Sequence, residues 1–89
     1  MRISTDERDS GYRLYAEAQA ACISFIVTLD GVREDLIVTA DDVAGEIVRH
    51  ATDARGNLCL DPVRAGQFLR ETIRGRVRII RKHKHWQQG

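Results

Sequence analysis

The sequence contains few of the residues that stabilise small secreted domains. Its 89 residues include two cysteines, one proline and one tryptophan, and aromatic residues make up 6% of the chain. Cys22 and Cys59 form no Cys-x-x-Cys pair and show no disulfide-framework spacing, so we expect reduced thiols. No basic n-region begins a signal peptide, and the longest nearly apolar run, Ala20–Leu29, is too short to span a bilayer. We therefore expect a cytoplasmic protein.

No stretch of the sequence has the spacing of a catalytic, cofactor or metal motif. The glycines form neither a phosphate loop nor a dinucleotide fingerprint, and no serine stands in a nucleophile elbow. The available soft metal ligands are Cys22, His50, Cys59 and His83. No two of them lie within four positions of each other, whereas zinc sites use paired short spacings. The acidic stretch 41–46 lacks the calcium-loop spacing. We predict that the chain is not an enzyme and binds no metal or cofactor.

The strongest structural signal is the pair Asp30-Gly31, which stands between two β-rich runs. A type I′ hairpin turn needs φ > 0 at both central positions, and Asp-Gly suits it. A two-residue loop pairs Leu29 with Val32 and continues until Cys22 lies opposite Thr39. Cross-strand partners share a face of the sheet, so this register gathers the apolar side chains on one face.

Glu34 does not fit this register, because it falls on the apolar face opposite Val27. A buried glutamate is rare unless it is paired, and an unpaired charge there is costly. A longer loop or a bulge that turns residues 32–35 outward is the favoured explanation. A functional Glu34 that faces inward is the alternative.

The N-terminal region is expected to contain one helix. Met1–Ser10 is polar and is interpreted as a loose start or an early helical turn. Tyr12–Ala21 is rich in alanine, with Leu14 at helical spacing from Ala18, which predicts a helix that Ser10 would cap. An extended segment around Tyr12 is the alternative.

The segment after the first hairpin is expected to turn and form another strand. Thr39 followed by Asp42 resembles a capping box, which predicts one short helical turn at Ala40–Ala44. Gly45 would end this turn. Glu46–Ala51 is then expected to be a strand.

A second hairpin and an irregular connection are expected next. Asp53–Asn57 has turn chemistry, so Leu58–Leu60 is predicted to return as a short strand beside Glu46–Ala51. Pro62 then suggests a loop or a brief helix. Phe68 and Leu69 are expected to anchor this connection to the core.

The last predicted strand is Glu71–Lys82, which shows period-two alternation. Ile73, Val77 and Ile79 fall on one face, and Arg74, Arg76 and Arg78 fall on the other. This pattern indicates a strand with one buried and one solvated face.

These elements predict a mainly β (α+β) domain that spans residues 1–89. We expect a small antiparallel sheet or a partly open barrel of four to five strands with one N-terminal helix, a loose segment at residues 1–10 and a basic tail at 82–89. A chain this short buries only about two thirds of its unfolded surface, so its core is thin. Small domains often gain stability by oligomerising, and we expect a homo-oligomer.

Several local phrases in the sequence resemble small proteins encoded in bacteriophages and prophages. They are Leu29-Asp-Gly-Val, Thr39-Ala-Asp-Asp, Gly45-Glu-Ile-Val-Arg-His, Gly56-Asn-Leu, Leu60-Asp-Pro and Arg74-Gly-Arg-Val-Arg-Ile. The resemblance covers roughly Cys22 to Ile80, and Phe68-Leu-Arg-Glu departs from it where a more turn-like connection is usual. It implies a phage setting, in the bacterial cytoplasm or in the phage particle, without a particular reaction or particular functional residues.

The charge of the chain is divided between its two parts. Residues 1–60 carry six arginines and eleven acidic residues, a net charge of −5, whereas residues 61–89 carry eight basic and two acidic residues, a net charge of +6. Such asymmetry indicates either a nucleic-acid arm or an acidic edge of one copy that meets a basic edge of the next.

The candidate contact residues for nucleic acid or a protein partner are Arg74, Arg76, Arg78, Arg81, Lys82, Lys84 and Trp86. Alternate side chains on a strand face lie about 6.6–7 Å apart, which approximates the phosphate spacing of one nucleic-acid strand, and the tryptophan could stack on a base. Charged residues on an edge strand also block aggregation. The favoured hypothesis is a non-enzymatic phage or prophage protein that acts through protein–protein contacts, for example in particle assembly. The alternative is a nucleic-acid-binding accessory protein.

Overall fold

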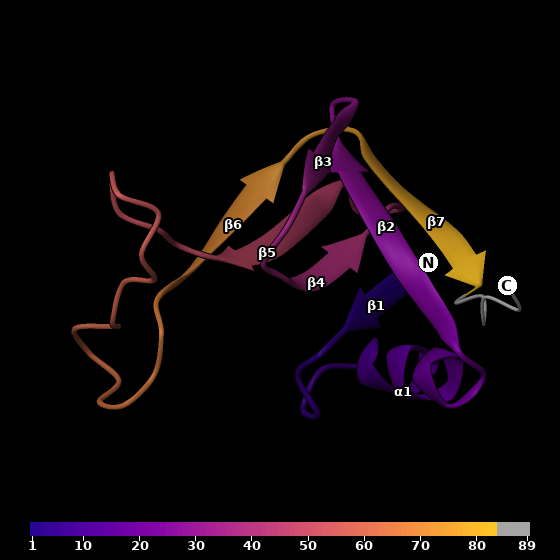
Figure 1. Cartoon of the computed structure of the whole chain (residues 1–89), viewed down its shortest axis with the longest axis horizontal. Helices are drawn as coiled ribbons and strands as arrows, with labels where there is room; N and C mark the ends of the chain where they lie inside the picture. Colours follow the sequence, from indigo (N-terminus) through magenta and orange to yellow (C-terminus); the bar gives the residue numbers. More distant parts are fainter. Residues whose placement is uncertain (84–89) are drawn as a thin grey trace, which may run out of the picture.

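The computed structural model describes residues 1–83 and divides seven strands between two antiparallel sheets (Figure 1). The elements, in chain order, are β1 (Arg2–Ser4), α1 (Tyr12–Ala20), β2 (Ile23–Leu29), β3 (Val32–Glu34), β4 (Ile37–Asp41), β5 (Glu46–His50), β6 (Arg70–Arg74) and β7 (Val77–His83). One sheet has the order β1-β4-β5-β6 and the other the order β3-β2-β7. The predicted mainly β (α+β) class with a helix near the N-terminus is confirmed, and the sheets do not close into a barrel.

The hairpin at Asp30-Gly31 has the predicted two-residue loop. Leu29 pairs with Val32, and the two turn residues have φ values of 51° and 83°. The favoured longer loop or bulge is therefore wrong, and Glu34 pairs with Val27. The register does not continue to Thr39, because β3 ends at Glu34 and β4 belongs to the other sheet.

The N-terminal residues form a strand, so the expectation of a loose or helical start is wrong. β1 lies at the edge of the four-stranded sheet, where Ile3 pairs with Ala40 and is buried. The helix α1 is confirmed, but its N-cap is Gly11 and no side chain caps it. A Cβ at Gly11 would lie 2.9 Å from the backbone of Arg2, so the close approach of α1 to β1 requires glycine.

The predicted helical turn at Ala40–Ala44 is also wrong, because β4 continues to Asp41. Residues 42–45 form the turn from β4 to β5. The Asp41 carboxylate accepts hydrogen bonds from the N–H groups of Val43 and Ala44, at 3.0 and 2.9 Å. Asp41 thus stabilises the turn between β4 and β5 through the same side-chain chemistry as a helix cap.

β5 is confirmed, but its predicted partner is wrong. β5 pairs with β4 on one side and with β6 on the other. The expected return strand reduces to one isolated bridge between Thr52 and Leu58. No helix follows Pro62 within the described chain. Phe68 does not anchor the connection to the core, because its side chain is exposed and its ring makes a T-shaped contact with that of His50.

The expected single strand over Glu71–Lys82 is divided at Gly75, where the chain passes from one sheet to the other. The Gly75 N–H donates to the carbonyl of Gly45 at 3.0 Å, which ends β6 beside the β4–β5 turn. A Cβ at Gly75 would lie 2.8 Å from Leu29 Cδ1. The alternation of buried and exposed residues nevertheless continues across this corner, with Val77 buried in β7.

The core lies between the two sheets. It consists of Ile3, Val27, Ala40, Ile47 and Val77, with Leu14, Tyr15, Phe25 and other half-buried apolar side chains packed around them. Its small size agrees with the thin core expected for this length. In the described part of the chain, α1 is too short and too polar to cross a membrane.

Candidate interaction surfaces

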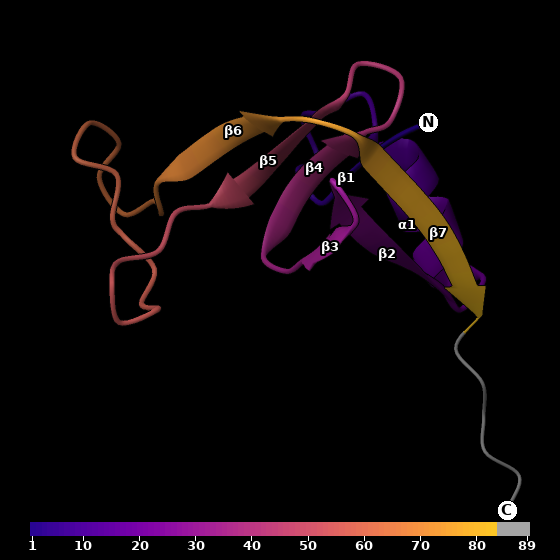
Figure 2. The ribbon, with the colours of Figure 1, turned by 90° about the horizontal axis from the view of Figure 1, so that it is seen from above.

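Residues 51–69 form an arm that projects from the β5–β6 end of the molecule (Figures 1 and 2). Three of its segments meet at the base. The Ala51 N–H donates to the Leu69 carbonyl at 2.9 Å, the Cys59 N–H to the Ala51 carbonyl at 3.1 Å, and the Leu69 N–H to the Cys59 carbonyl at 2.7 Å. The arm is therefore a backbone-bonded extension of the β5–β6 ladder.

The arm presents its apolar side chains to solvent. Eight large apolar side chains are exposed within residues 1–83, and four of these lie in the arm: Leu58 (36% exposed), Leu60 (68%), Val63 (88%) and Phe68 (45%). Ala51, at the base, is the one buried residue of the arm. Such a concentration of exposed apolar side chains on a small protein is typical of an interaction surface.

Two aspartates hold the loops of the arm in shape. The Asp53 carboxylate accepts hydrogen bonds from the N–H groups of Arg55 and Asn57, and the Asp61 carboxylate accepts them from those of Val63 and Arg64. These backbone hydrogen bonds lower the pKa of both aspartates. With two acidic and two basic residues, the arm carries no net charge.

A pocket of about 260 Å³ opens among α1, β1, β2 and β4. Its lining consists of Ile3, Ser4, Thr5, Tyr15, Gln19, Ser24, Phe25, Val27, Ile37 and Val38. None of these side chains is charged at neutral pH. Two further hollows in the described chain include charged residues, Arg33, Glu34 and Asp35 in one and Asp30, Arg76 and Arg78 in the other.

The structure does not place the predicted row of arginines on one strand. Arg74 ends β6 and lies 3.7 Å from the Glu46 carboxylate, in the four-stranded sheet. Arg76 and Arg78 lie beyond the corner, in or next to β7, and share the outer face of this strand with Lys82, because Val77 points inward. Arg81 alternates onto the opposite face and is exposed. Lys84 and Trp86 lie outside the described residues.

Arg33 joins this outer face from β3, although the sequence pattern did not indicate it. Thr28 of β2 pairs with Arg33 on one side and with Arg78 on the other, so the three side chains form a row across the sheet. Arg33 lies 3.7 Å from Asp35, whereas Arg76, Arg78 and Lys82 form no ion pair with any residue between 1 and 83. Only the register across the hairpin could have identified Arg33.

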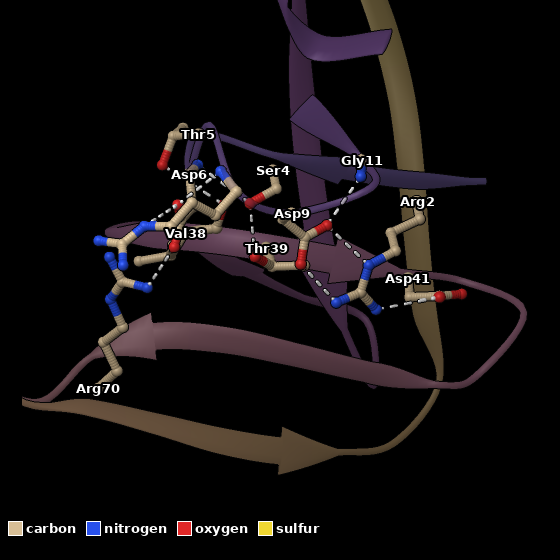
Figure 3. Close-up of polar contacts among 11 residues, drawn as sticks. Arg2, Ser4, Thr5, Asp6, Asp9, Gly11, Val38, Thr39, Asp41 and Arg70 are labelled. Carbon is tan, nitrogen blue, oxygen red and sulfur yellow. Dashed lines mark hydrogen bonds and ion pairs between the residues drawn. The ribbon is translucent and has the colours of Figure 1, made fainter. Parts of the chain in front are cut away.

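A second polar cluster ties the N-terminal segment to the first sheet (Figure 3). Arg2 binds Asp9 through two nitrogens, with Nη2 2.7 Å from Oδ2, and its Nη1 lies 3.3 Å from Asp41. The hydrogen bond from Arg2 lowers the pKa of Asp9. Arg70, at the start of β6, donates to Asp6 at 2.9 Å. Because each charge here has a partner, we interpret the cluster as structural: it holds β1 and the segment that follows it against the four-stranded sheet.

The possible metal ligands do not converge in the described part of the chain. Residues 1–83 contain no group of three or more His, Cys, Asp or Glu side chains that could hold a metal ion. Cys22 and Cys59 are free thiols. The His50 Nδ1 is buried without a hydrogen-bond partner among the described residues, and its ring faces Phe68 of the arm.

Comparisons with protein-family models, with curated proteins and with solved structures found no match to this chain.

Proposed function

We propose that this chain is a non-enzymatic protein of phage or prophage origin that acts through protein–protein contacts, with particle assembly as its setting. The arm at residues 51–69 is the observation that supports this function. It extends from the molecule, exposes four large apolar side chains and has no net charge. Its partner in this proposal is another copy of the chain.

The energetics of the arm favour a partner. Ordering a backbone residue costs about 1–2 kcal/mol, and the exposed apolar side chains of the arm gain little burial in return. Burying one of its valine, leucine or phenylalanine side chains against a partner would contribute about 1.5–3 kcal/mol. Hydrogen bonds that the carboxylates of Asp53 and Asp61 accept from backbone N–H groups preserve the shape of the loops, which lowers the cost of binding.

An arm-shortened variant tests this function. Ala51 and Leu69 are already joined by a backbone hydrogen bond, so residues 52–68 can be replaced by Asn-Gly in a two-residue hairpin turn. We expect the wild type to form a discrete oligomer in sedimentation velocity at micromolar concentration, and the variant to be a folded monomer. An arm-shortened variant with the same oligomeric state as the wild type would refute the proposal.

Nucleic-acid binding is the second candidate function, and one observation favours it. Arg33, Arg78 and Lys82 lie on the outer face of the three-stranded sheet. Arg78 and Lys82 have no ion-pair partner within residues 1–83. Unpaired cations on one face provide the sequence-independent part of nucleic-acid affinity.

A further inference from the structure

We infer that the arm of one copy inserts an exposed apolar side chain into the uncharged pocket of the next copy, so that the chains assemble head to tail. This inference rests on the proposed function, since it names the surface that receives the arm. The donor surface is the set of exposed side chains at Leu58, Leu60, Val63 and Phe68. The acceptor surface is the pocket among α1, β1, β2 and β4.

The pocket has the size and chemistry to receive a side chain of the arm. A dry cavity of about 150 Å³ lined by Leu, Ile and Phe holds a benzene ring. The pocket here measures about 260 Å³, and Tyr15, Phe25 and Ile37 contribute to its wall. A valine, leucine or phenylalanine side chain of the arm therefore fits within this volume.

The absence of charged side chains in its wall distinguishes this pocket from the two hollows that contain charged residues. An apolar side chain that enters a hollow removes water from its wall, which costs much free energy where the wall is charged. The hollows that contain Glu34 or Arg78 have such walls. The pocket beside α1 has none, and the arm itself is neutral.

The direction of the arm makes the contact intermolecular. In both ribbon views the arm extends away from α1, and the pocket wall includes Tyr15 and Gln19 of α1 (Figures 1 and 2). A copy therefore presents its donor and its acceptor at different ends. Such heterologous contacts close into a ring when the rotation between neighbours permits it, and a closed ring is the discrete oligomer expected for the wild type.

A crossed mixing experiment tests this assembly. The arm-shortened variant keeps the acceptor and lacks the donor. A second variant, Thr5→Lys with Gln19→Lys, keeps the donor and places two charges at exposed positions in the pocket wall. Ala20→Lys is the matched control, because Ala20 is exposed on the same helix and does not line the pocket.

We expect each variant alone to sediment as a monomer, and the control to assemble like the wild type. An equimolar mixture should form a 1:1 complex with twice the monomer mass and nothing larger, because each chain has only one functional surface. Circular dichroism and thermal unfolding identify a misfolded variant, in which case Thr5→Lys or Gln19→Lys alone replaces the double change.

Three results would overturn the inference, and they differ from failure of the proposed function. The pocket variant could assemble like the wild type, the mixture could remain monomeric, or Ala20→Lys could block assembly as fully as the pocket variant. Each would show that an arm-dependent oligomer uses another acceptor. A wild type that stays monomeric at every concentration would instead refute the proposed function and, with it, this inference.

Discussion

The guanidinium of Arg49 donates a hydrogen bond through Nη1 to the carboxylate of Glu34, and so connects the two sheets. Arg49 lies on β5 of the four-stranded sheet and Glu34 on β3 of the three-stranded sheet. The Arg49 Nε also donates to Glu71 on β6 at 2.8 Å. These two carboxylates, Glu71 first, raise the pKa of Arg49. Glu34 can therefore lie on the inner face of the hairpin, because its charge is paired with that of Arg49.

A double-mutant cycle with Glu34→Gln and Arg49→Met should give a coupling free energy of about 1–2 kcal/mol, because the Glu34 side chain is only 15% exposed and its hydrogen bond is charge-assisted. Denaturant unfolding of the four proteins measures this value. The pair Arg13–Glu17 is the control, since its side chains are 89% and 62% exposed, and it should give at most about 0.5 kcal/mol. Equal coupling in both cycles would contradict the role of Arg49 between the sheets.

Gly31→Val should lower the free energy of unfolding by more than about 1 kcal/mol. The φ of Gly31 is +83°, which a β-branched side chain resists, and a Cβ there would meet no atom within 4 Å. The cost is therefore conformational. Gly31→Asn should cost much less, because asparagine tolerates positive φ. Equal thermal stability of the wild type and both variants would show that the turn is not strained by the substitution.

Acidification should destabilise the protein through the two aspartates that bind Arg2, Asp9 and Asp41. The hydrogen bond from Arg2 lowers the pKa of Asp9, and the backbone N–H of Ala44, with help from Arg2, lowers that of Asp41. A carboxylate whose pKa is lower in the folded state stabilises the protein above its unfolded pKa of about 3.9 and loses this effect as the pH falls through the folded pKa.

The free energy of unfolding should therefore decrease steadily below about pH 4, the unfolded pKa of aspartate. Arg2→Met should make this decrease shallower, since it raises both folded pKa values. Arg13→Met is the control, because within residues 1–83 Arg13 pairs only with the exposed Glu17, and it should leave the slope unchanged. Urea unfolding at several pH values measures the effect, and parallel curves for Arg2→Met and the wild type would contradict it.

The leading function predicts no binding of single- or double-stranded DNA at physiological salt. If nucleic acid does bind the outer face, the logarithm of the binding constant falls with the logarithm of the salt concentration. The triple change of Arg76, Arg78 and Lys82 to Gln should make this slope shallower by about 2–3 units, or about 0.7–0.9 for each phosphate that is no longer neutralised. Arg74→Gln is the control, since Arg74 lies in the other sheet beside Glu46. A fluorescence titration at two salt concentrations distinguishes these cases, and micromolar binding that the triple variant weakens would favour the second candidate function.

The local patterns predicted the helix, the Asp30-Gly31 hairpin and the inward position of Val77, because each depends on neighbouring residues. The pairing of β5 with β6 and the position of β1 depend on partners distant in sequence. Ile3, for example, is buried against Ala40. A short polar segment with one isoleucine contains no periodic signal for such an edge strand.

The structure differs from the local pattern at Glu34 and at Gly75, because both features depend on residues distant in sequence, Arg49 for the first and Gly45 for the second. Glu34 was expected to turn outward because its partner, Arg49, is fifteen residues away. The corner at Gly75 leaves the alternation of Ile73 and Val77 intact, so the pattern could not reveal a change of sheet. Arg74, Arg76 and Arg78 are exposed, as the alternation predicts. The sequence pattern does not indicate the arm, because it predicts that Phe68 packs against the core.

The most direct test of the central claim compares two exposed valines. Val63 is 88% exposed in the arm, and Val43 is 85% exposed in the β4–β5 turn. Sedimentation velocity at micromolar concentration should show that Val63→Asp dissociates the oligomer into folded monomers, because it places a charge in the contact of the arm. Val43→Asp should assemble like the wild type. Assembly of Val63→Asp that equals that of Val43→Asp would contradict the account.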